Sequence, residues 1–407
     1  MTRLHDLSLV AQVAALRDGR IRPVELTSHY LDRIARAADL GAFAEVTAES
    51  ALARAAALDA GGHRGPLWGV PSAEKDLVAR AGVPTRYGSR ARADYVAVAA
   101  GLLPAAVGSD GGGSIRIPSA TVGVVGLKPS RGRLPIGSGF DSPDGLSVTG
   151  PIARTVEDAG LLLDALVGLS PFPYATAAPG RGPFVRAART GSATYRIGAT
   201  TVSPWDDDED IVLDPAARTA FETAAVWLSD AGHPVTDADW HPVGYPALFR
   251  VLWRASAARI PLSAHDMTLV EPLTAWLVRE GRALSAPELL GGLTEARAFE
   301  RRTITDFAAF DAVLTPALAQ APQPVGAYAG HDPERTFAMQ VEYAPYSSFV
   351  NVAGLPALTL PVTVDATGHP VSVQLIGRPG GEATLLALGA ELELRRGPLP
   401  HPPAWDA

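Results

Sequence analysis

The chain has 407 residues, of which 47% are hydrophobic and 19% are charged, a composition that supplies a large buried core. These fractions exclude disorder, collagen and coiled coil as descriptions of the whole chain. The net charge of −8 argues against nucleic-acid and anionic-membrane partners, and the absence of cysteine excludes disulfides, thiolate metal sites and cysteine nucleophiles.

Neither a membrane span nor an export signal is evident in the sequence. The longest candidate span, from Tyr95 to Gly108, is too short to cross a bilayer and is interrupted by Pro104. Charged residues from Arg3 to Asp6 precede any apolar run at the N-terminus, unlike in a secretory signal. We therefore expect a soluble, cytoplasmic protein.

Apolar spacing predicts helices and strands that alternate along the chain. Near the N-terminus it predicts helices at 9–16, 25–38 and 44–60, then a buried strand at 102–107, a glycine turn and a following helix. Further strands are predicted at 196–202, 311–316, 357–362 and 371–376, and further helices at 155–167, 215–231, 245–260, 269–281, 287–308 and 382–394. This interleaving favours an α/β layered fold. The Pro- and Gly-rich stretch 171–195 has the composition of a linker, but its flanks continue one fold, so we predict a single domain over 1–407.

Two features point to chemistry. The chain holds 33 arginines but only two lysines, Lys75 and Lys128, and a buried lysine, unlike arginine, can lose its proton and act as a base. Three glycines, Gly111 to Gly113, precede Ser114, so that backbone N–H groups can approach a ligand closely, as an oxyanion hole requires. A structural helix N-cap explains Ser114 equally well.

Other familiar sites are absent from the sequence. Neither Ser114 nor Ser109 lies in a GxSxG nucleophile elbow, and the glycine segment matches neither the P-loop nor the dinucleotide pattern. There is no HExxH, the nine histidines are scattered, and the acidic run Asp206 to Asp210 is better explained as a solvated loop than as a cation site. We expect neither a metal nor a cofactor.

The stretch from Ala106 to Leu134 strongly resembles the core motif of the amidase signature family. It contains Gly-Ser-Asp-Gly-Gly-Gly-Ser-Ile-Arg-Ile-Pro-Ser-Ala and then Gly-Leu-Lys-Pro-Ser-Arg-Gly-Arg-Leu. Four other segments are similar to the family in the same order: 69–76 around the lysine, 150–155 after the core, and 349–357 and 373–377 near the C-terminus. The resemblance implies an amidase-signature layered fold, with a central mixed β-sheet flanked by helices.

The resemblance also implies roles for individual residues. The family hydrolyses amides with a Ser–Ser–Lys triad, in which Lys75 matches the base and Ser114 the nucleophile that forms an acyl-enzyme. Gly111, Gly112 and Gly113 match the oxyanion hole. Asp110 and Arg116 match supporting charges beside that loop, and Lys128 matches a position with a structural role.

The sequence departs from the family where the bridging serine belongs. The Gly-Gly-Ser-Ser-Gly-Gly motif that should carry this serine is missing, and only 39 positions separate Lys75 from Ser114. The break falls around residues 90–98, so we expect one strand–helix unit to be missing as well. Lys75 would then reach Ser114 directly, through water, or through a substitute such as Ser72, Ser89 or Ser119.

The sequence thus predicts an amidase that cleaves a small carboxylic amide. This amide is the expected partner, and a homodimer is left open as the oligomeric state. Two alternatives stay open: a catalytically impaired or dead homologue that binds without turnover, and a glutamine-hydrolysing amidotransferase A-subunit. The acyl pocket is expected within about 171–350. Aromatic candidates there, although more typical of core, are Trp205, Trp240, Trp253, Trp276, Phe249 and Tyr343; Arg250 and Arg254 are candidates for binding a carboxylate, although surface placement is favoured.

Overall fold

The computed structural model describes residues 3–62, 65–75, 94–134, 145–168, 182–189 and 193–406. Its strands are β1 (Ala105–Asp110), β2 (Val125–Lys128), β3 (Val148–Ala153), β4 (Ile197–Ala199), β5 (Val235–Asp237), β6 (Ala312–Pro316), β7 (Ala357–Val364) and β8 (Pro370–Gly377). The helices of the N-terminal half are α1 (Leu9–Arg17), α2 (Pro23–Arg36), α3 (Ala48–Ala60), α4 (Asp94–Ala99), α5 (Arg116–Val122), α6 (Val156–Val167) and α7 (Phe184–Arg189). Those of the C-terminal half are α8 (Pro215–Asp230), α9 (Tyr245–Ala258), α10 (Pro272–Arg282), α11 (Ala286–Asp306), α12 (Pro333–Tyr343), α13 (Ser348–Val352) and α14 (Glu382–Arg396).

The described strands form one mixed sheet in the order β1-β3-β2-β7-β8-β6-β4-β5. Strand β4 runs parallel to β5 and β6, and the other pairs are antiparallel. The ladders align the C-terminal ends of β1, β2 and β8 with the N-terminal ends of β3, β7 and β6. The turn after β1, which contains Ser114, therefore lies at the end of the sheet where these strand termini meet.

The two faces of the sheet are covered differently. Helices α6, α8 and α14 pack against one face, where Leu358, Leu360 and Leu375 contribute to the main apolar core. Helices α4 and α5 pack against the other. Because side chains alternate along a strand, Thr359 and Gln374 point to the α5 face. The face of the sheet that carries these two polar side chains therefore packs against α5, the helix that follows Ser114.

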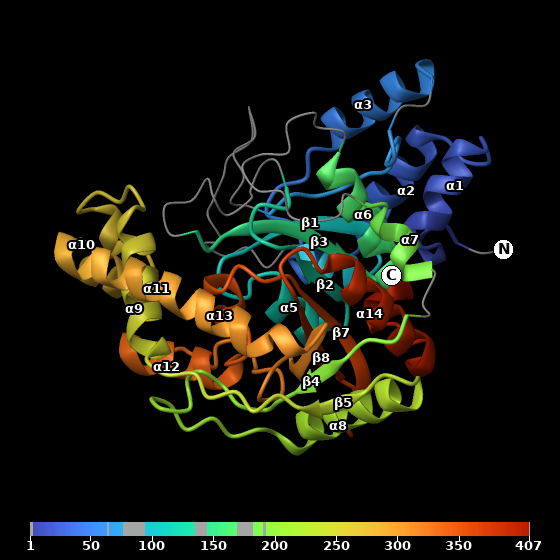
Figure 1. The fold of residues 1–407 in the computed structure, drawn as a ribbon. Helices are drawn as coiled ribbons and strands as arrows, with labels where there is room; N and C mark the ends of the chain where they lie inside the picture. The colour runs from blue at the N-terminus through green and yellow to red at the C-terminus, as the bar shows by residue number, and fades with distance from the viewer. Residues whose placement is uncertain are drawn as a thin grey trace.

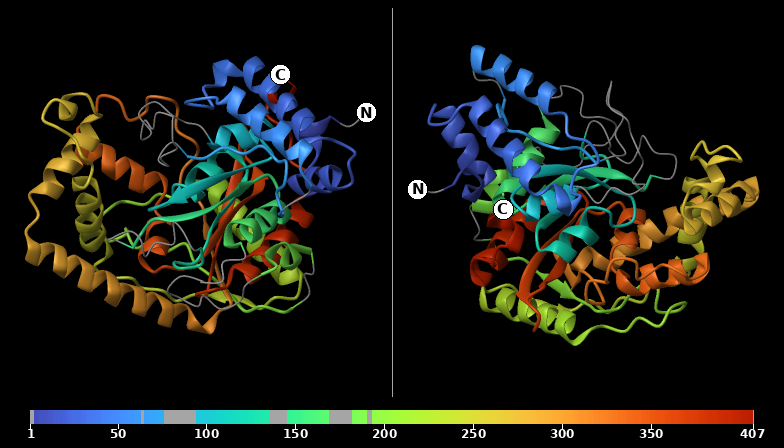
Figure 2. Two further views of the ribbon diagram at one scale, coloured as in Figure 1. Left: turned by 90° about the horizontal axis from the view of Figure 1, so that it is seen from above. Right: turned by 180° about the vertical axis from the view of Figure 1, so that it is seen from behind.

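Helices α9 to α12 project from the sheet on the side opposite the N-terminal helices α1 to α3, as both figures show (Figures 1 and 2). The two ends of the chain lie together: the indole Nε1 of Trp405 donates to Asp6, and Arg3 pairs with Asp406 at 2.6 Å. Helices α9 to α12 therefore form a lobe that lies apart from the paired chain ends (Figures 1 and 2).

The alternation of strands and helices is confirmed, with several boundaries corrected. The strand predicted at 102–107 is β1, which begins at Ala105 and runs to Asp110, because Gly108 to Asp110 pair with β3 instead of turning. The helix predicted from residue 44 begins at Ala48, and the strand at 196–202 covers only Ile197–Ala199. The helix at 269–281 begins at Pro272.

Candidate active site

Ser114 lies in the turn between β1 and α5 and is half-buried. The N-cap of α5 is Ile115, not Ser114, which removes the cap as an explanation for the serine. Gly113 has φ +128°, and a Cβ there would overlap Ser347 Oγ and the Ile117 side chain. Both its backbone conformation and its surroundings therefore require glycine at position 113.

A buried ion pair holds the two ends of this turn together. Asp110 closes β1 and Arg116 opens α5, and the two side chains meet at 2.9 Å with 0% and 1% exposure. Burial alone would raise the pKa of Asp110, but the charge and hydrogen bonds of Arg116 keep this pKa well below its ordinary value. The Asp110 carboxylate also accepts from the backbone N–H of Gly113 at 2.7 Å. The pair thus fixes the backbone on both sides of Ser114.

Residues far along the chain satisfy the remaining polar atoms of this pair. Arg116 donates to the Asn351 side chain at 2.6 Å and to the Gln374 side chain at 2.8 Å. The Asn351 amide donates to both the carboxylate and the carbonyl of Asp110. Ser347 Oγ donates to the Gly112 carbonyl at 2.8 Å. Such complete pairing is what a buried charged network needs to be stable.

The three glycines differ in what their N–H groups do. The N–H of Gly113 donates to the Asp110 carboxylate. The N–H groups of Gly111 and Gly112 make no hydrogen bond within the part of the chain that the structure describes. Two fixed donors next to a hydroxyl can stabilise a developing oxyanion.

Lys75 approaches the same end of β1 from a neighbouring segment. Residues 73–75 run beside β1, where Glu74 and Val107 form a parallel bridge, and Lys75 Nζ donates to the Ser109 carbonyl at 3.2 Å. Ser109 directly precedes Asp110, so both predicted catalytic residues lie at the C-terminal end of this strand. The amine and the hydroxyl are positioned by the two ends of one short stretch, Ser109 to Ser114.

The proposed substitutes for the bridging serine lie elsewhere or outside the described residues. Ser72 is exposed and its hydroxyl contacts the Ala73 carbonyl at 3.4 Å. Ser119 is fully buried on α5, where its side chain packs near Gly126 of β2. Ser89 lies outside the described residues. The structure therefore gives neither Ser72 nor Ser119 a position in the turn.

Lys128, the second lysine, is fully buried at the end of β2 and donates to the Pro129 carbonyl at 2.9 Å. Burial first, and then the charge of Arg116, lower the pKa of Lys128 to about 7. The folded protein then binds fewer protons than the unfolded chain between pH 7 and about 10, so this group makes the free energy of unfolding rise with pH.

We expect Lys128→Met to remove that dependence. Relative to the variant, the parent should gain about 2 kcal/mol of unfolding free energy between pH 7 and pH 9. Urea unfolding of both proteins across this range measures the difference. Two pH curves that run parallel would show that Lys128 stays charged in the folded protein.

A stack of aromatic side chains on α9 lies against the glycine turn. Tyr245, Phe249 and Trp253 are spaced four residues apart, with ring centroids 5.6 and 5.4 Å from one to the next. A Cβ placed on Gly112 would lie 3.5 Å from the Phe249 ring and 3.6 Å from that of Trp253. At the other end of the stack, the Tyr245 hydroxyl donates to Ser348 at 2.7 Å.

The other aromatic and arginine candidates make their contacts with residues outside the turn. Trp205 and Trp240 are 1% and 2% exposed, within the core of the α9–α13 region, and Tyr343 contacts Thr121. The guanidinium of Arg254 lies 5.2 Å from the Trp276 ring centroid, and that of Arg250 pairs with Asp208 and Glu209. The acidic run therefore binds an arginine of its own chain, and no cluster suited to a metal occurs among the described residues.

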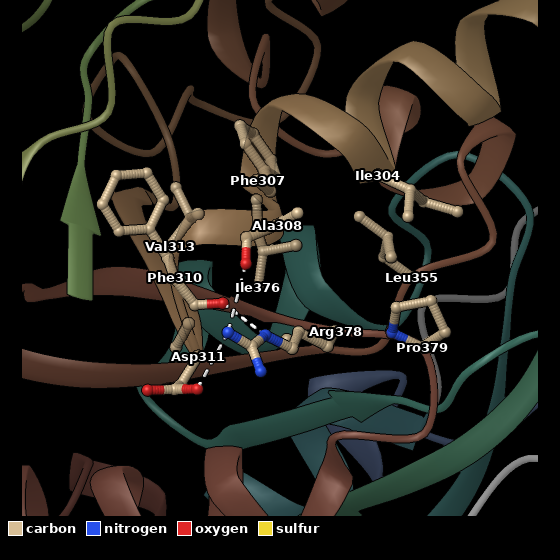
Figure 3. Close-up of a pocket in the computed structure, with 12 residues that line it drawn as sticks. Ile304, Phe307, Ala308, Phe310, Asp311, Val313, Leu355, Ile376, Arg378 and Pro379 are labelled. Atoms are coloured by element: carbon tan, nitrogen blue, oxygen red, sulfur yellow. Dashed lines mark hydrogen bonds and ion pairs between the residues drawn. The ribbon is translucent and has the colours of Figure 1, made fainter. Parts of the chain in front are cut away.

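A separate cavity of about 280 Å³ opens beside β6 and β8 (Figure 3). Arg378 crosses it, donating to the carbonyls of Phe310 and Ala308 and pairing with Asp311 at 3.0 Å. Its other walls are mainly apolar, with Ile304 and Phe307 among them. Its two charged groups pair with each other, and none of the described residues that line it carries a hydroxyl that could act as a nucleophile.

Sequence reasoning missed the roles of Asn351, Gln374 and Ser347. Asn351 and Gln374 fall within the two C-terminal segments that resemble the family, so a signal for their importance was present. Their roles depend on hydrogen bonds with Arg116, which is more than 230 positions away along the chain. No helix in the described residues is both long and apolar enough to cross a membrane.

Comparison with known proteins identifies one family along nearly the whole chain. The family model described as Amidase matches residues 25–98 and 96–386. The protein named AmiB2 of Mycobacterium tuberculosis (strain ATCC 25618 / H37Rv) is 34% identical over 462 aligned positions, which cover 97% of each chain. That alignment is longer than the 407 residues of this chain, so AmiB2 has residues that this chain lacks.

Two further similarities come from one relative in sequence and one in structure. The glutamyl-tRNA(Gln) amidotransferase A-subunit of Chloroflexus aurantiacus (strain ATCC 29366 / DSM 635 / J-10-fl) is 31% identical over 96% of each chain. The solved structure of 6-aminohexanoate cyclic dimer hydrolase complexed with substrate has a TM-score of 0.83, at 23% identity, over 99% of this chain and 100% of that chain. The structural similarity confirms the mixed-sheet α/β fold.

Proposed function

The chain belongs to the amidase family of hydrolases, and from this premise we propose that it cleaves a small carboxylic amide through a serine acyl-enzyme. The observation that carries the proposal is the contact between Lys75 Nζ and the Ser109 carbonyl. It brings the amine to the strand end from which the Ser114 turn emerges. We propose one catalytic domain over 1–407, with the substrate pocket formed from about 171–350.

In the proposed reaction, neutral Lys75 accepts the Ser114 proton as Oγ attacks the amide carbonyl carbon. The N–H groups of Gly111 and Gly112 stabilise the oxyanion of the tetrahedral intermediate. The amine leaves with a proton from Lys75, and water then attacks the acyl-enzyme to release the acid and regenerate Ser114. The reaction uses no cofactor.

We propose that Lys75 acts on Ser114 directly or through a water, without the bridging serine of the family. Two observations support a missing segment: the family match comes in two pieces that meet at residues 96–98, and the alignment with AmiB2 exceeds the length of this chain. In the sheet, β1 is the edge strand among the described residues, with only the short Glu74 bridge on its outer side. An absent strand–helix unit would leave β1 in this position.

Covalent labelling with a fluorophosphonate probe, read by intact mass, tests the proposal. We expect one label per chain in the parent and none in Ser114→Ala. Ser109→Ala is the matched control, since it removes a nearby hydroxyl but keeps the carbonyl that Lys75 contacts. Circular dichroism and thermal unfolding establish that all three proteins fold.

A folded parent that takes no label would favour the catalytically impaired homologue, and a label retained in Ser114→Ala would assign the nucleophile elsewhere. Glutamine turnover together with co-purifying subunits would favour the amidotransferase A-subunit. Hydrolysis of simple amides by the isolated chain supports the amidase.

A further inference from the structure

The fold does not require glycine at positions 111 and 112. Neither residue has φ in the left-handed region. A Cβ on Gly112 would lie 3.5 Å or more from its neighbours, and one on Gly111 would lie 3.8 Å or more, both ordinary contact distances. Gly113, by contrast, combines positive φ with overlap. A Cβ therefore fits at the first two positions, in ordinary contact with the side chains around it.

One edge of the Trp253 ring lies beside both positions. Its Cζ3 atom lies 3.9 Å from the Cβ position of Gly111 and 3.6 Å from that of Gly112. The nearest side chains at the two positions belong to Ser147, Phe249 and Trp253, and none carries a charge. A charged group held here would meet no counter-ion among these neighbours.

Trp253 is held firmly but is not fully covered. The Phe249 ring stacks on it with an interplanar angle of 19°, while Trp253 itself is only partly buried. Phe249 is 4% exposed and stacks in turn on Tyr245, which is anchored to Ser348. The partly exposed Trp253 ring, fixed beside two N–H donors that no described residue takes up, offers a flat apolar contact surface.

Resting on the proposed function, we propose that Trp253 selects the acyl group and favours planar, apolar amides such as benzamide over small aliphatic or charged ones. A substrate whose carbonyl oxygen accepts from the Gly111 and Gly112 N–H groups places its acyl group beside this ring. An aryl group there gains an aromatic contact and buries apolar surface. A small aliphatic acyl group gains much less.

The test compares kcat/KM for benzamide and propionamide in the parent, Trp253→Ala, Trp253→Phe and Trp276→Leu. We expect Trp253→Ala to lower the benzamide-to-propionamide ratio by about tenfold or more. Trp253→Phe should restore most of the ratio because it keeps an aromatic ring. Trp276→Leu, which removes another partly buried tryptophan of the same lobe, should leave it within about twofold of the parent. An unchanged ratio in Trp253→Ala overturns the inference even if hydrolysis itself is confirmed.

Binding separates this inference from failure of the proposed reaction. Calorimetric titration of Ser114→Ala protein with benzamide and with propionamide measures selection without turnover. We expect benzamide to bind more tightly, and Ser114→Ala/Trp253→Ala to lose that advantage. Equal binding of benzamide by both proteins rejects the role of Trp253, whereas selective binding in a protein without hydrolysis keeps that role and rejects only the reaction.

Discussion

Replacing Lys75 with methionine is expected to lower kcat for amide hydrolysis by about 1,000-fold or more, because Ser114 loses the base that removes its proton. Lys75→Arg should be nearly as inactive. Arginine can still donate to the Ser109 carbonyl but does not release its proton at working pH. Steady-state kinetics of the three proteins, with unfolding midpoints to confirm folding, measure the effect.

The pair of variants separates the roles of a base and of a positioning cation. Activity within tenfold of the parent in Lys75→Arg would mean that positive charge or placement, not proton transfer, is what Lys75 supplies. Activity retained in Lys75→Met would remove the lysine from the mechanism altogether. The fluorophosphonate reaction should slow in parallel with kcat, since the same deprotonated serine attacks the probe.

The sequence named the residues of the candidate site but missed strands of the sheet around them. The glycine-rich turn and the two lysines stand close together along the chain, and their resemblance to one family is specific. Strands β2 and β3 were missed because Val125–Lys128 and Val148–Ala153 are short and include glycine or proline, which weakens the alternation that marks a strand. Their pairing with β1 and β7 supplies what their local sequence lacks.

Contacts distant in sequence explain what could not be predicted within the site. Glutamine is a residue type mostly found at the surface, yet Gln374 is 1% exposed within an apolar strand and accepts a hydrogen bond from Arg116. The different role of Gly113 likewise depends on the position of Asp110 and Ser347, which no spacing rule supplies. Trp253 was named among aromatics typical of core, and only the packing of α9 brings it to the turn.

Replacing Arg116 with methionine is expected to lower the free energy of unfolding by about 3–5 kcal/mol, because it leaves the Asp110 carboxylate buried without its cation. The Gln374 and Asn351 oxygens would lose a donor as well. Urea unfolding measures the change. Arg250→Met is the matched control, since Arg250 is also ion-paired, with Asp208 and Glu209, but is 27% exposed, and we expect it to cost no more than about 1 kcal/mol.

The double variant Asp110→Asn/Arg116→Met determines whether the cost comes from the stranded charge. Because the pKa of Asp110 is held below its ordinary value, the ion pair stabilises the fold above about pH 4. This stabilisation is lost as pH falls through the acidic range. If the charge is the cause, the double variant should be more stable than Arg116→Met at pH 7, and the destabilisation by Arg116→Met should shrink toward pH 3. Equal losses in the single and double variants at both pH values would instead assign the cost to lost packing and to the hydrogen bonds that Arg116 donates to Asn351, Gln374 and the Ser347 carbonyl. In either case Arg116→Met removes the ion pair that holds the two ends of the Ser114 turn together. We therefore expect kcat to fall together with stability in Arg116→Met and to stay near the parent value in Arg250→Met.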